Sequence, residues 1–342
     1  MFNRSVAGQF PTRVQFELTY RCNIHCVHCY TDPFNTLPRL RRELGLEEIL
    51  RILDELKAAG TFWITLTGGE AFVHPRFKEI YLAARERGFV LHLYTNGTTV
   101  TESLADFLAE DPPFTIDVSC HGATEETFER ITQVRGSFQR FQEGVRRILQ
   151  RNLPLKIKTK AMTENRHELK KIKEWVEGLG QKFNLYTTIH PRLDGDLSST
   201  AYRLSPEEIL DLEQSALPVE RETGRCREDL FNAPSDDRLF RCGCGTNTCT
   251  ISPYGRLRAC THTTWPERDL RTMPFQQAFS ELAKEIRQAA YRGDTPCRRC
   301  SVYRFCNKNP VTARIEAGSM EAPVAHYCDL AYGRAERMGQ GR

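Results

Sequence analysis

The sequence lacks the features that would place it in a membrane, on a secretory route or on nucleic acid. Its apolar runs stay well short of the ~18 residues needed to cross a bilayer, so we expect no membrane partner. Residues 1–13 lack the apolar stretch of a signal peptide. Like charges form no basic tail, and the net charge of +4 over 342 residues is mild, which disfavours nucleic acid. We therefore expect a cytoplasmic protein, without repeats or low-complexity tracts.

Cysteine, by contrast, is abundant, with 13 residues. A reducing compartment does not favour disulfides, so this number indicates metal binding or catalysis. Three cysteines lie in one short window, Cys22 to Cys29, and eight more lie between Cys242 and Cys328. Only Cys120 and Cys226 stand apart.

Residues 13 to 190 alternate β-rich runs with amphipathic helical stretches. The predicted strands are Val14–Thr19, Phe62–Thr67, Val90–Asn96, Phe114–Ser119, Leu155–Ala161 and Phe183–His190. The predicted helices are Leu46–Ala59, Arg76–Arg87, Glu102–Glu110, Ser137–Gln150 and Arg166–Leu179. This order predicts an α/β fold with a parallel sheet covered by helices. Six units are fewer than the eight of a closed TIM barrel, so we expect a partial (β/α)6 TIM-like barrel.

Within the predicted strands, polar and apolar residues alternate. In the first strand Glu17 lies between Phe16 and Leu18, and in the fifth Lys158 and Lys160 alternate with apolar neighbours. Because helices must cover the apolar face, the polar face looks inward, where unpaired charges would be too costly in a packed core. The pattern predicts a cavity for a polar ligand. The alternative, an antiparallel sheet with one solvated face, is disfavoured by the crossover helices.

The second half of the chain changes character after a predicted helical segment, Ser205–Thr223. We expect three segments: a core over 1–200, a linker with a bridging helix over 201–240, and a small cysteine-rich α+β domain over 241–342. The first predicted strand begins within the first fifteen residues, so no separate N-terminal peptide-recognition domain is visible.

The three early cysteines follow the first strand directly. Ligands of α/β folds sit beyond the carboxyl ends of strands. Cys22, Cys26 and Cys29, spaced C-x3-C-x2-C, provide three thiolates for a [4Fe–4S] cube that usually takes four. One iron is then open, the mark of a metal site that binds substrate. The alternatives are a zinc knuckle that uses His25 or His28, and an electron-transfer ferredoxin.

This spacing at this position resembles the radical S-adenosylmethionine (SAM) superfamily. The resemblance implies that Cys22, Cys26 and Cys29 are the catalytic cluster ligands, and that the open iron binds SAM. Reduction, by a flavodoxin- or ferredoxin-type partner, then cleaves SAM to methionine and a 5′-deoxyadenosyl radical that abstracts hydrogen from substrate. The protein positions cofactor and substrate and excludes side reactions.

Further strand ends carry motifs that look like those of the family. Gly68, Gly69 and Glu70 resemble the GGE segment, which implies contact with the SAM amino group. Asn96 and Ser119 end the third and fourth strands, and the matching serine often touches the SAM ribose.

The resemblance is less complete beyond the fourth strand. Gly122 resembles a family glycine, but His121 stands where aspartate is common, which leaves that position without a role. Lys158 and Lys160 are candidates to pair with the SAM carboxylate; the alternative is that they point into solvent.

The C-terminal cysteines resemble the SPASM extension, which carries up to two auxiliary [4Fe–4S] clusters in peptide- and protein-modifying radical SAM enzymes. The candidate ligands of the first cluster are Cys242, Cys244, Cys249 and Cys260, and those of the second are Cys297, Cys300, Cys306 and Cys328. Pro310 stands where a further cysteine of the pattern is expected, beside Asn309. Cys242 and Cys244 are only two residues apart, so we expect one of the pair to bind with Cys249 and Cys260, leaving an open iron. The alternatives are four-cysteine ligation and a pair of zinc sites, although only one C-x2-C knuckle is present.

Together these features predict a radical SAM/SPASM oxidoreductase that modifies a ribosomal peptide or small protein by cross-linking, thioether formation or oxidation. A separate recognition protein would then carry the peptide. The alternatives are a small-molecule oxidase or decarboxylase and a non-enzymatic iron–sulfur electron carrier.

Overall fold

The computed structural model describes residues 10–219 and 237–339. Cys226 and the end of the predicted Ser205–Thr223 helix fall outside these ranges. In the part described, that helix, α9, spans only Pro206–Gln214, and Pro218 soon follows it. Within the described ranges, no helix is both long and apolar enough to span a bilayer.

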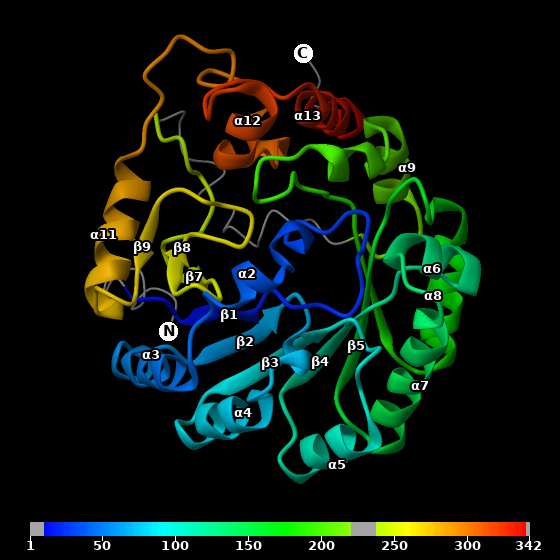
Figure 1. Ribbon diagram of the computed structural model, residues 1–342. Helices are drawn as coiled ribbons and strands as arrows, with labels where there is room; N and C mark the ends of the chain where they lie inside the picture. The colour runs from blue at the N-terminus through cyan, green and yellow to red at the C-terminus, as the bar shows by residue number, and fades with distance from the viewer. Residues whose placement is uncertain (1–9, 220–236, 340–342) are drawn as a thin grey trace.

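A single curved sheet organises the molecule, with helices on its outer side (Figure 1). Its strands run in the order β6-β5-β4-β3-β2-β1-β7-β8-β9. Their bounds are β1 Arg13–Thr19, β2 Trp63–Gly68, β3 Val90–Thr95, β4 Thr115–Ser119, β5 Leu155–Lys160, β6 Lys182–Tyr186, β7 Thr248–Ile251, β8 Arg256–Arg258 and β9 Glu267–Asp269. Strands β1 to β7 pair in parallel, whereas β8 and β9 are antiparallel. The predicted partial (β/α)6 barrel is confirmed.

Helices α3, α4, α5, α7 and α8 lie on the outer face of the sheet, whereas α12 and α13 lie away from it (Figure 1). The described α-helices are α2 Leu37–Leu40, α3 Leu46–Ala58, α4 Phe77–Glu86, α5 Glu102–Glu110, α6 Glu125–Thr132, α7 Ser137–Gln150, α8 Leu169–Gly178, α9 Pro206–Gln214, α11 Phe275–Gln288, α12 Pro310–Ala317 and α13 Ala325–Arg337. The prediction missed α6, which Thr124 caps by accepting a hydrogen bond from Thr127 N at 3.3 Å. It also extended the sixth strand to His190, but β6 ends at Tyr186, whose carbonyl accepts the last bond from the β5 side, from Ala161 N at 2.8 Å.

The alternation predicted for the strands determines which face each side chain occupies. Val14, Phe16 and Leu18 of β1 are at most 1% exposed and belong to the apolar core under the helices. On the other, inner face, Lys158 of β5 lies over the ring of Tyr94 of β3, with Nζ 3.2 Å from the ring centroid. Apolar burial at roughly 25 cal/mol per Å² favours this orientation, and a one-residue slip would reverse it.

The cysteine-rich segment continues the same sheet. Strand β7 pairs with β1 in parallel, with Val14 opposite Cys249 and Phe16 opposite Ile251. Helix α11, which follows β9, packs against α3, and Phe275 N donates to Glu55 at 2.7 Å. The sheet therefore crosses the expected boundary between core and C-terminal domain, so β7–β9 has a fixed position relative to β1.

Two ion pairs of low exposure connect the C-terminal helices to the linker region. Arg203 pairs with Glu316 of α12 at 2.6 Å, and Arg334 of α13 pairs with Glu213 of α9 at 2.6 Å. Their side chains are 8–10% exposed. Removing one partner of such a pair typically costs about 3–5 kcal/mol, because the remaining charge stays buried and unpaired.

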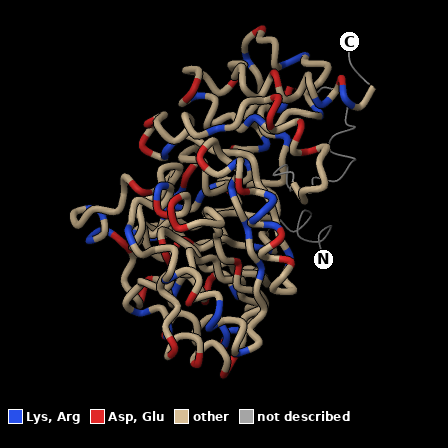
Figure 2. Tube along the Cα trace, turned by 90° about the vertical axis from the view of Figure 1, so that its right-hand side faces the viewer, with Lys and Arg blue, Asp and Glu red and all other residues tan. Residues whose placement is uncertain are grey.

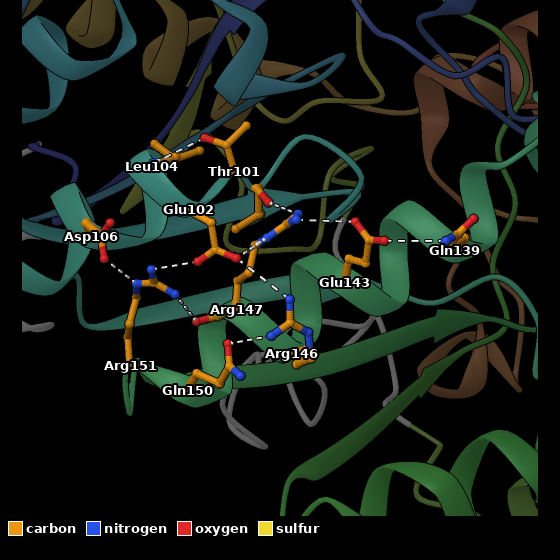
Figure 3. Close-up of polar contacts among 11 residues, drawn as sticks. Thr101, Glu102, Leu104, Asp106, Gln139, Glu143, Arg146, Arg147, Gln150 and Arg151 are labelled. Carbon is orange, nitrogen blue, oxygen red and sulfur yellow. Dashed lines mark hydrogen bonds and ion pairs between the residues drawn. The ribbon is translucent and has the colours of Figure 1, made fainter.

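On the surface, basic and acidic residues are interspersed along the described trace (Figure 2). One exposed network joins α5 to α7: Glu102 accepts hydrogen bonds from Arg147 at 2.9 Å and Arg151 at 2.7 Å (Figure 3). Arg147 also donates to the Val100 carbonyl at 2.9 Å, which fixes the segment after β3. Exposed pairs of this kind contribute little, roughly 0–1 kcal/mol each.

The packing of α7 on the β3 loop generates a stability prediction. A Cβ on Gly144 would lie 2.0 Å from the carbonyl oxygen of Gly97, so Gly144→Ala must displace backbone. We expect it to lower the free energy of unfolding by at least about 1–3 kcal/mol. Gly178→Ala in α8 is the matched control, because nothing lies within 4 Å of its added Cβ. Thermal unfolding measures both; equal melting temperatures would contradict the close contact.

Candidate active site

The carboxyl ends of the parallel strands meet at one edge of the sheet, and the predicted site residues follow them. The loop of Cys22, Cys26 and Cys29 follows β1, and Gly68–Glu70 follows β2. Asn96 comes directly after β3, and Ser119 ends β4. Ser119 lies opposite Lys158 of β5 in the parallel register.

The cysteine loop is fixed by backbone hydrogen bonds to the end of α6. His25 N donates to Thr132 O at 2.9 Å, and Val27 N donates to Ile131 O at 3.0 Å. Cys29 N donates to Cys26 O at 2.9 Å, which closes a turn inside the loop. The unpredicted helix α6 thus supports the loop that carries the thiols.

The three thiols lie close enough to influence one another. Burial raises the pKa of Cys22 to about 12, and the charges of Glu70 and Cys29 raise it further. Burial also raises the pKa of Cys26, with the nearby thiols Cys29 and Cys22 as the next causes. Three thiolates can coexist here only beside a strong positive charge, and iron provides one.

Each of these sulfurs has a polar neighbour that can donate to it. Asn96 Nδ2 lies 3.7 Å from Cys22 Sγ, and Thr31 Oγ1 lies 3.4 Å from Cys29 Sγ. His121 Nε2 lies 3.7 Å from Cys26 Sγ. Donors around metal-bound sulfur orient the ligands and tune the metal, so the three-thiol set fits a [4Fe–4S] cluster with one open iron.

The glycine pair after β2 packs directly on the cysteine loop. Gly68 has φ +147°, and a Cβ there would lie 2.2 Å from the Thr19 carbonyl oxygen. A Cβ on Gly69 would lie 2.5 Å from the Arg21 carbonyl oxygen. Gly69 N donates to Thr19 O at 2.7 Å. The glycines therefore have a packing reason in addition to the predicted contact with SAM, which stays a prediction.

Glu70 is buried, 1% exposed, and its carboxylate bridges two strand ends. It accepts hydrogen bonds from Asn96 N at 2.7 Å, Thr95 Oγ1 at 2.9 Å and Phe72 N at 3.1 Å. Burial raises its pKa to about 7, against the opposing effect of these bonds. Oε2 has only the Asn96 bond among those described, so it retains capacity to accept an ammonium group.

Asn96 also connects the β3 end to the cysteine loop. Its Nδ2 donates to Asn23 Oδ1 at 3.0 Å, and its Oδ1 accepts from Thr98 N at 2.8 Å. Asn23 in turn donates to Thr98 Oγ1 at 2.7 Å. This closed network orients the backbone around Cys22.

The two candidate lysines differ in their surroundings. Burial lowers the pKa of Lys158 to about 8, and its ammonium group lies over Tyr94. Lys160 donates to the Thr188 carbonyl at 2.7 Å and lies on the same strand face. Both ammonium groups therefore lie on the inner face, and pairing with the SAM carboxylate stays a prediction.

The sequence analysis missed Glu168 and gave His121 no role. Glu168 accepts hydrogen bonds from Ala123 N at 2.6 Å and Thr124 Oγ1 at 2.6 Å, which fixes the loop after His121. His121 packs against the ring of His28 with centroids 5.4 Å apart, and burial lowers its pKa to about 4. A lone glutamate in a helical stretch gives no sequence signal for this role.

A buried polar cluster links the cysteine loop to the C-terminal segment. Glu17, fully buried, accepts from Tyr20 OH at 3.2 Å and Tyr30 OH at 3.1 Å. The ring centroids of Tyr30 and His262 lie 4.8 Å apart, and those of His262 and His190 lie 3.9 Å apart. Since Tyr30 follows Cys29 and His262 lies two residues after Cys260, the two cysteine sites face a common region.

Three of the four thiols predicted for the first auxiliary cluster lie close together. Cys242, Cys244 and Cys260 share hydrogen bonds, and the bond from Cys244 lowers the pKa of Cys260. Asn309 Nδ2 lies 3.7 Å from Cys260 Sγ, while its Oδ1 caps α12 by accepting from Val311 N at 2.8 Å. Asn309 is therefore a donor to sulfur, because its oxygen is already engaged.

Cys249 does not join these three thiols. It pairs with Val14, is 3% exposed and belongs to the apolar core on the helix side of the sheet. Burial alone raises its pKa, without a contribution from another cysteine. The expectation that only one of Cys242 and Cys244 joins Cys249 and Cys260 does not match this arrangement, because strand alternation directs Cys249 away from them.

The thiols of the second auxiliary set influence one another electrostatically, and their role as cluster ligands stays a prediction. The charges of Cys297 and Cys300 raise the pKa of Cys328 after burial, and those of Cys328 and Cys297 act on Cys306. Lys308 Nζ lies 3.3 Å from Cys297 Sγ. Among the described residues, no three His, Cys, Asp or Glu side chains form a site for a single metal ion.

Comparison with known proteins agrees with this geometry. Residues 16–176 match the radical SAM superfamily. The AdoMet-dependent heme synthase of Methanosarcina barkeri is 24% identical over 298 residues, covering 81% of this chain and 85% of that protein. The mycofactocin maturase MftC of Mycobacterium tuberculosis is 26% identical over 327 residues, covering 90% and 80%.

The fold is also that of a solved structure. Streptococcus suis SuiB bound to its precursor peptide SuiA superimposes with a TM-score of 0.67 at 13% identity, over 92% of this chain and 75% of that one. Residues 16–176, which match the radical SAM superfamily, contain the three-thiol loop and the strand-end motifs described above. The chain therefore contains a radical SAM domain and is a radical SAM enzyme.

Proposed function

We propose that this chain is a peptide-modifying radical SAM maturase that uses auxiliary iron–sulfur clusters. The observation that carries the proposal is the common region shared by the Cys22–Cys29 loop and the Cys260 segment, which Tyr30 and His262 connect. An enzyme that oxidises a substrate radical needs an electron acceptor near its SAM site. The likeness to MftC and to SuiB with its precursor peptide supports a ribosomal peptide as the substrate.

Cys22, Cys26 and Cys29 would hold the catalytic cluster, which with bound SAM would supply the radical chemistry on reduction. Around it, Glu70 accepts the SAM ammonium group and Gly68 and Gly69 keep the cysteine loop against β2. Tyr94 and the inner-face lysines exclude water from the region where the radical would act, because their side chains occupy the polar face of the sheet.

Three thiols, Cys242, Cys244 and Cys260, hold the first auxiliary cluster in this proposal and leave one iron open. Cys297, Cys300, Cys306 and Cys328 hold the second. Lys308 offsets part of the negative charge of the second set, since its ammonium lies beside Cys297 Sγ.

The proposal includes partners and a location. A flavodoxin- or ferredoxin-type protein delivers the electron, and a separate recognition protein presents the peptide. We place the enzyme in the cytoplasm because a reducing compartment favours metal-binding thiolates over disulfides in a chain with 13 cysteines.

A second candidate is a small-molecule substrate, favoured by the likeness to the M. barkeri heme synthase over 81% of this chain. The two candidates predict different neighbouring genes and different substrates. A short open reading frame next to the gene, whose peptide product gains a mass change when incubated with enzyme, SAM and reductant, would support the peptide. A mass change in a porphyrin with none in the peptide would support the small molecule.

The central prediction concerns SAM cleavage. We expect the anaerobically reconstituted, reduced protein to convert SAM to 5′-deoxyadenosine and methionine. Cys22→Ala/Cys26→Ala/Cys29→Ala removes the ligands and should abolish this, while iron falls from ~12 to ~8 per chain if each cluster has four irons. Chromatography and iron analysis provide the readouts. Unchanged cleavage in the triple variant would refute the assignment.

A second prediction separates Glu70 from the cluster ligands. Glu70→Gln removes the carboxylate charge but retains an acceptor and the shape of the side chain. We expect SAM binding to weaken by about tenfold or more, the loss of one charge-assisted hydrogen bond, without loss of iron. Equilibrium dialysis with labelled SAM measures the affinity. An unchanged dissociation constant would mean that Glu70 acts only as a brace between β2 and β3.

A third prediction concerns the auxiliary thiols. Cys244→Ala should lower the iron content by ~4 per chain, because it removes one of the three thiols that lie together. Cys249→Ala is the matched control and should retain the full iron content, because Cys249 lies in the apolar core. Iron loss in Cys249→Ala with retention in Cys244→Ala would reverse the assignment.

A further inference from the structure

A cavity lined with arginine lies beside the cysteine loop, and the described functions leave it without a role. It measures about 270 Å³ and is bounded by α2 and the β7–β8–β9 region. Five of its lining residues are arginines, Arg39, Arg42, Arg256, Arg258 and Arg271, against one carboxylate, Glu267. The remaining lining residues are the aromatic Phe34 and Tyr254.

Three of the five arginines already have carboxylate partners. Arg258 pairs with Glu267 at 3.1 Å, and Arg256 pairs with Asp269 at 3.0 Å. Arg271 pairs with Glu48 at 2.8 Å. These pairs neutralise much of the wall, so any net charge must come from the other two arginines.

Arg39 and Arg42 have no carboxylate partner among the described residues. Arg39 lies over the Phe34 ring at 4.4 Å, and Arg42 lies over the Tyr254 ring at 5.5 Å. A guanidinium that lies over an aromatic face keeps the N–H groups at the edge of its own plane available to bind a carboxylate in a bidentate manner. The cavity therefore presents two oriented, uncompensated cations on an aromatic wall.

Side-chain contacts connect the cavity to the catalytic cysteine loop. Tyr20 lies beneath it, with its ring 5.2 Å from Phe34 and 5.4 Å from Tyr254. The Tyr20 hydroxyl donates to Glu17 at 3.2 Å, and Tyr20 is two residues before Cys22. A chain bound in the cavity would thus begin its path next to the loop that carries the catalytic thiols.

We propose that this cavity binds an acidic segment of the peptide substrate, with Arg39 and Arg42 as its carboxylate-binding residues. The proposal rests on the proposed peptide maturase function and names the feature that the peptide must carry. The rings of Phe34 and Tyr254 in the cavity lining offer apolar contacts next to the charged ones. A peptide fits this combination better than a nucleic acid does, because basic and acidic residues are interspersed along the rest of the described chain (Figure 2).

Fluorescence anisotropy on the full, anaerobically reconstituted protein tests the proposal. The probe is a short rhodamine-labelled peptide of alternating serine and glutamate; its comparison is the same peptide with glutamine. We expect the glutamate peptide to bind more tightly, with an affinity that falls as salt rises. Arg39→Gln/Arg42→Gln should weaken its binding about tenfold or more, as expected for the loss of ~1.4 kcal/mol or more.

The matched control is Arg140→Gln/Arg146→Gln, which removes the same charge from exposed positions of α7; Figure 3 shows Arg146. It should retain wild-type affinity for the glutamate peptide. Iron content and thermal unfolding of both double variants exclude misfolding as the cause. Equal weakening in both double variants would reduce the effect to net charge and overturn the proposal.

Two further arms make the outcome decisive. Equal affinity of the wild type for the glutamate and glutamine peptides would overturn the proposal. Tighter binding of a labelled oligothymidine that Arg39→Gln/Arg42→Gln abolishes would reassign the cavity to nucleic acid. Because the assay requires no SAM cleavage, a negative result here leaves the proposed maturase function intact, and failure of SAM cleavage in the wild type leaves the binding result intact.

Discussion

The close contact between the β2 end and the cysteine loop is the constraint on which the rest of the site depends. There is no room for a Cβ on Gly68 or Gly69, because the carbonyl oxygens of Thr19 and Arg21 would lie 2.2 and 2.5 Å away. Since β1 and β2 are adjacent parallel strands, this contact fixes the start of the loop relative to the sheet. Glu70, next in the chain, then extends the same restraint to β3. The positions of the three thiols follow from backbone packing before any cofactor contributes.

The same sheet also positions the C-terminal cysteines. The segment that leads to Cys260 begins with β7, and β7 pairs with β1, the strand that precedes the catalytic loop. Glu17 and Tyr30 on one side and His262 on the other fill the region between the two cysteine sites. A separate, loosely tethered domain could not maintain such contacts, whereas a continuous sheet can, because its register fixes both sides at once.

The sequence was informative where local pattern determines structure. Alternation in the strands and the C-x3-C-x2-C spacing were enough to predict the barrel, its polar inner face and the cysteine loop at the end of β1. Pairing between β1 and β7 could not be predicted, because strands so far apart in sequence give no local signal of their contact. Cys249 was assigned by its closeness in sequence to other cysteines. Its neighbours Thr248 and Thr250 alternate with Cys249 and Ile251, and that pattern indicates the apolar face. The roles of Glu168, His262 and Lys308 depend only on tertiary contacts, and a single residue in a sequence gives no signal of such contacts.

Electron paramagnetic resonance of the reduced, reconstituted protein with and without SAM tests the central claim most directly, because it observes the open iron itself. To isolate the catalytic cluster, the measurement uses a variant in which the auxiliary cysteines Cys244, Cys260, Cys297 and Cys300 are replaced by alanine. If Cys22, Cys26 and Cys29 hold a cluster with one free iron, a [4Fe–4S] signal remains in this variant, and SAM changes its g values. A cluster signal that SAM leaves unchanged would contradict the account.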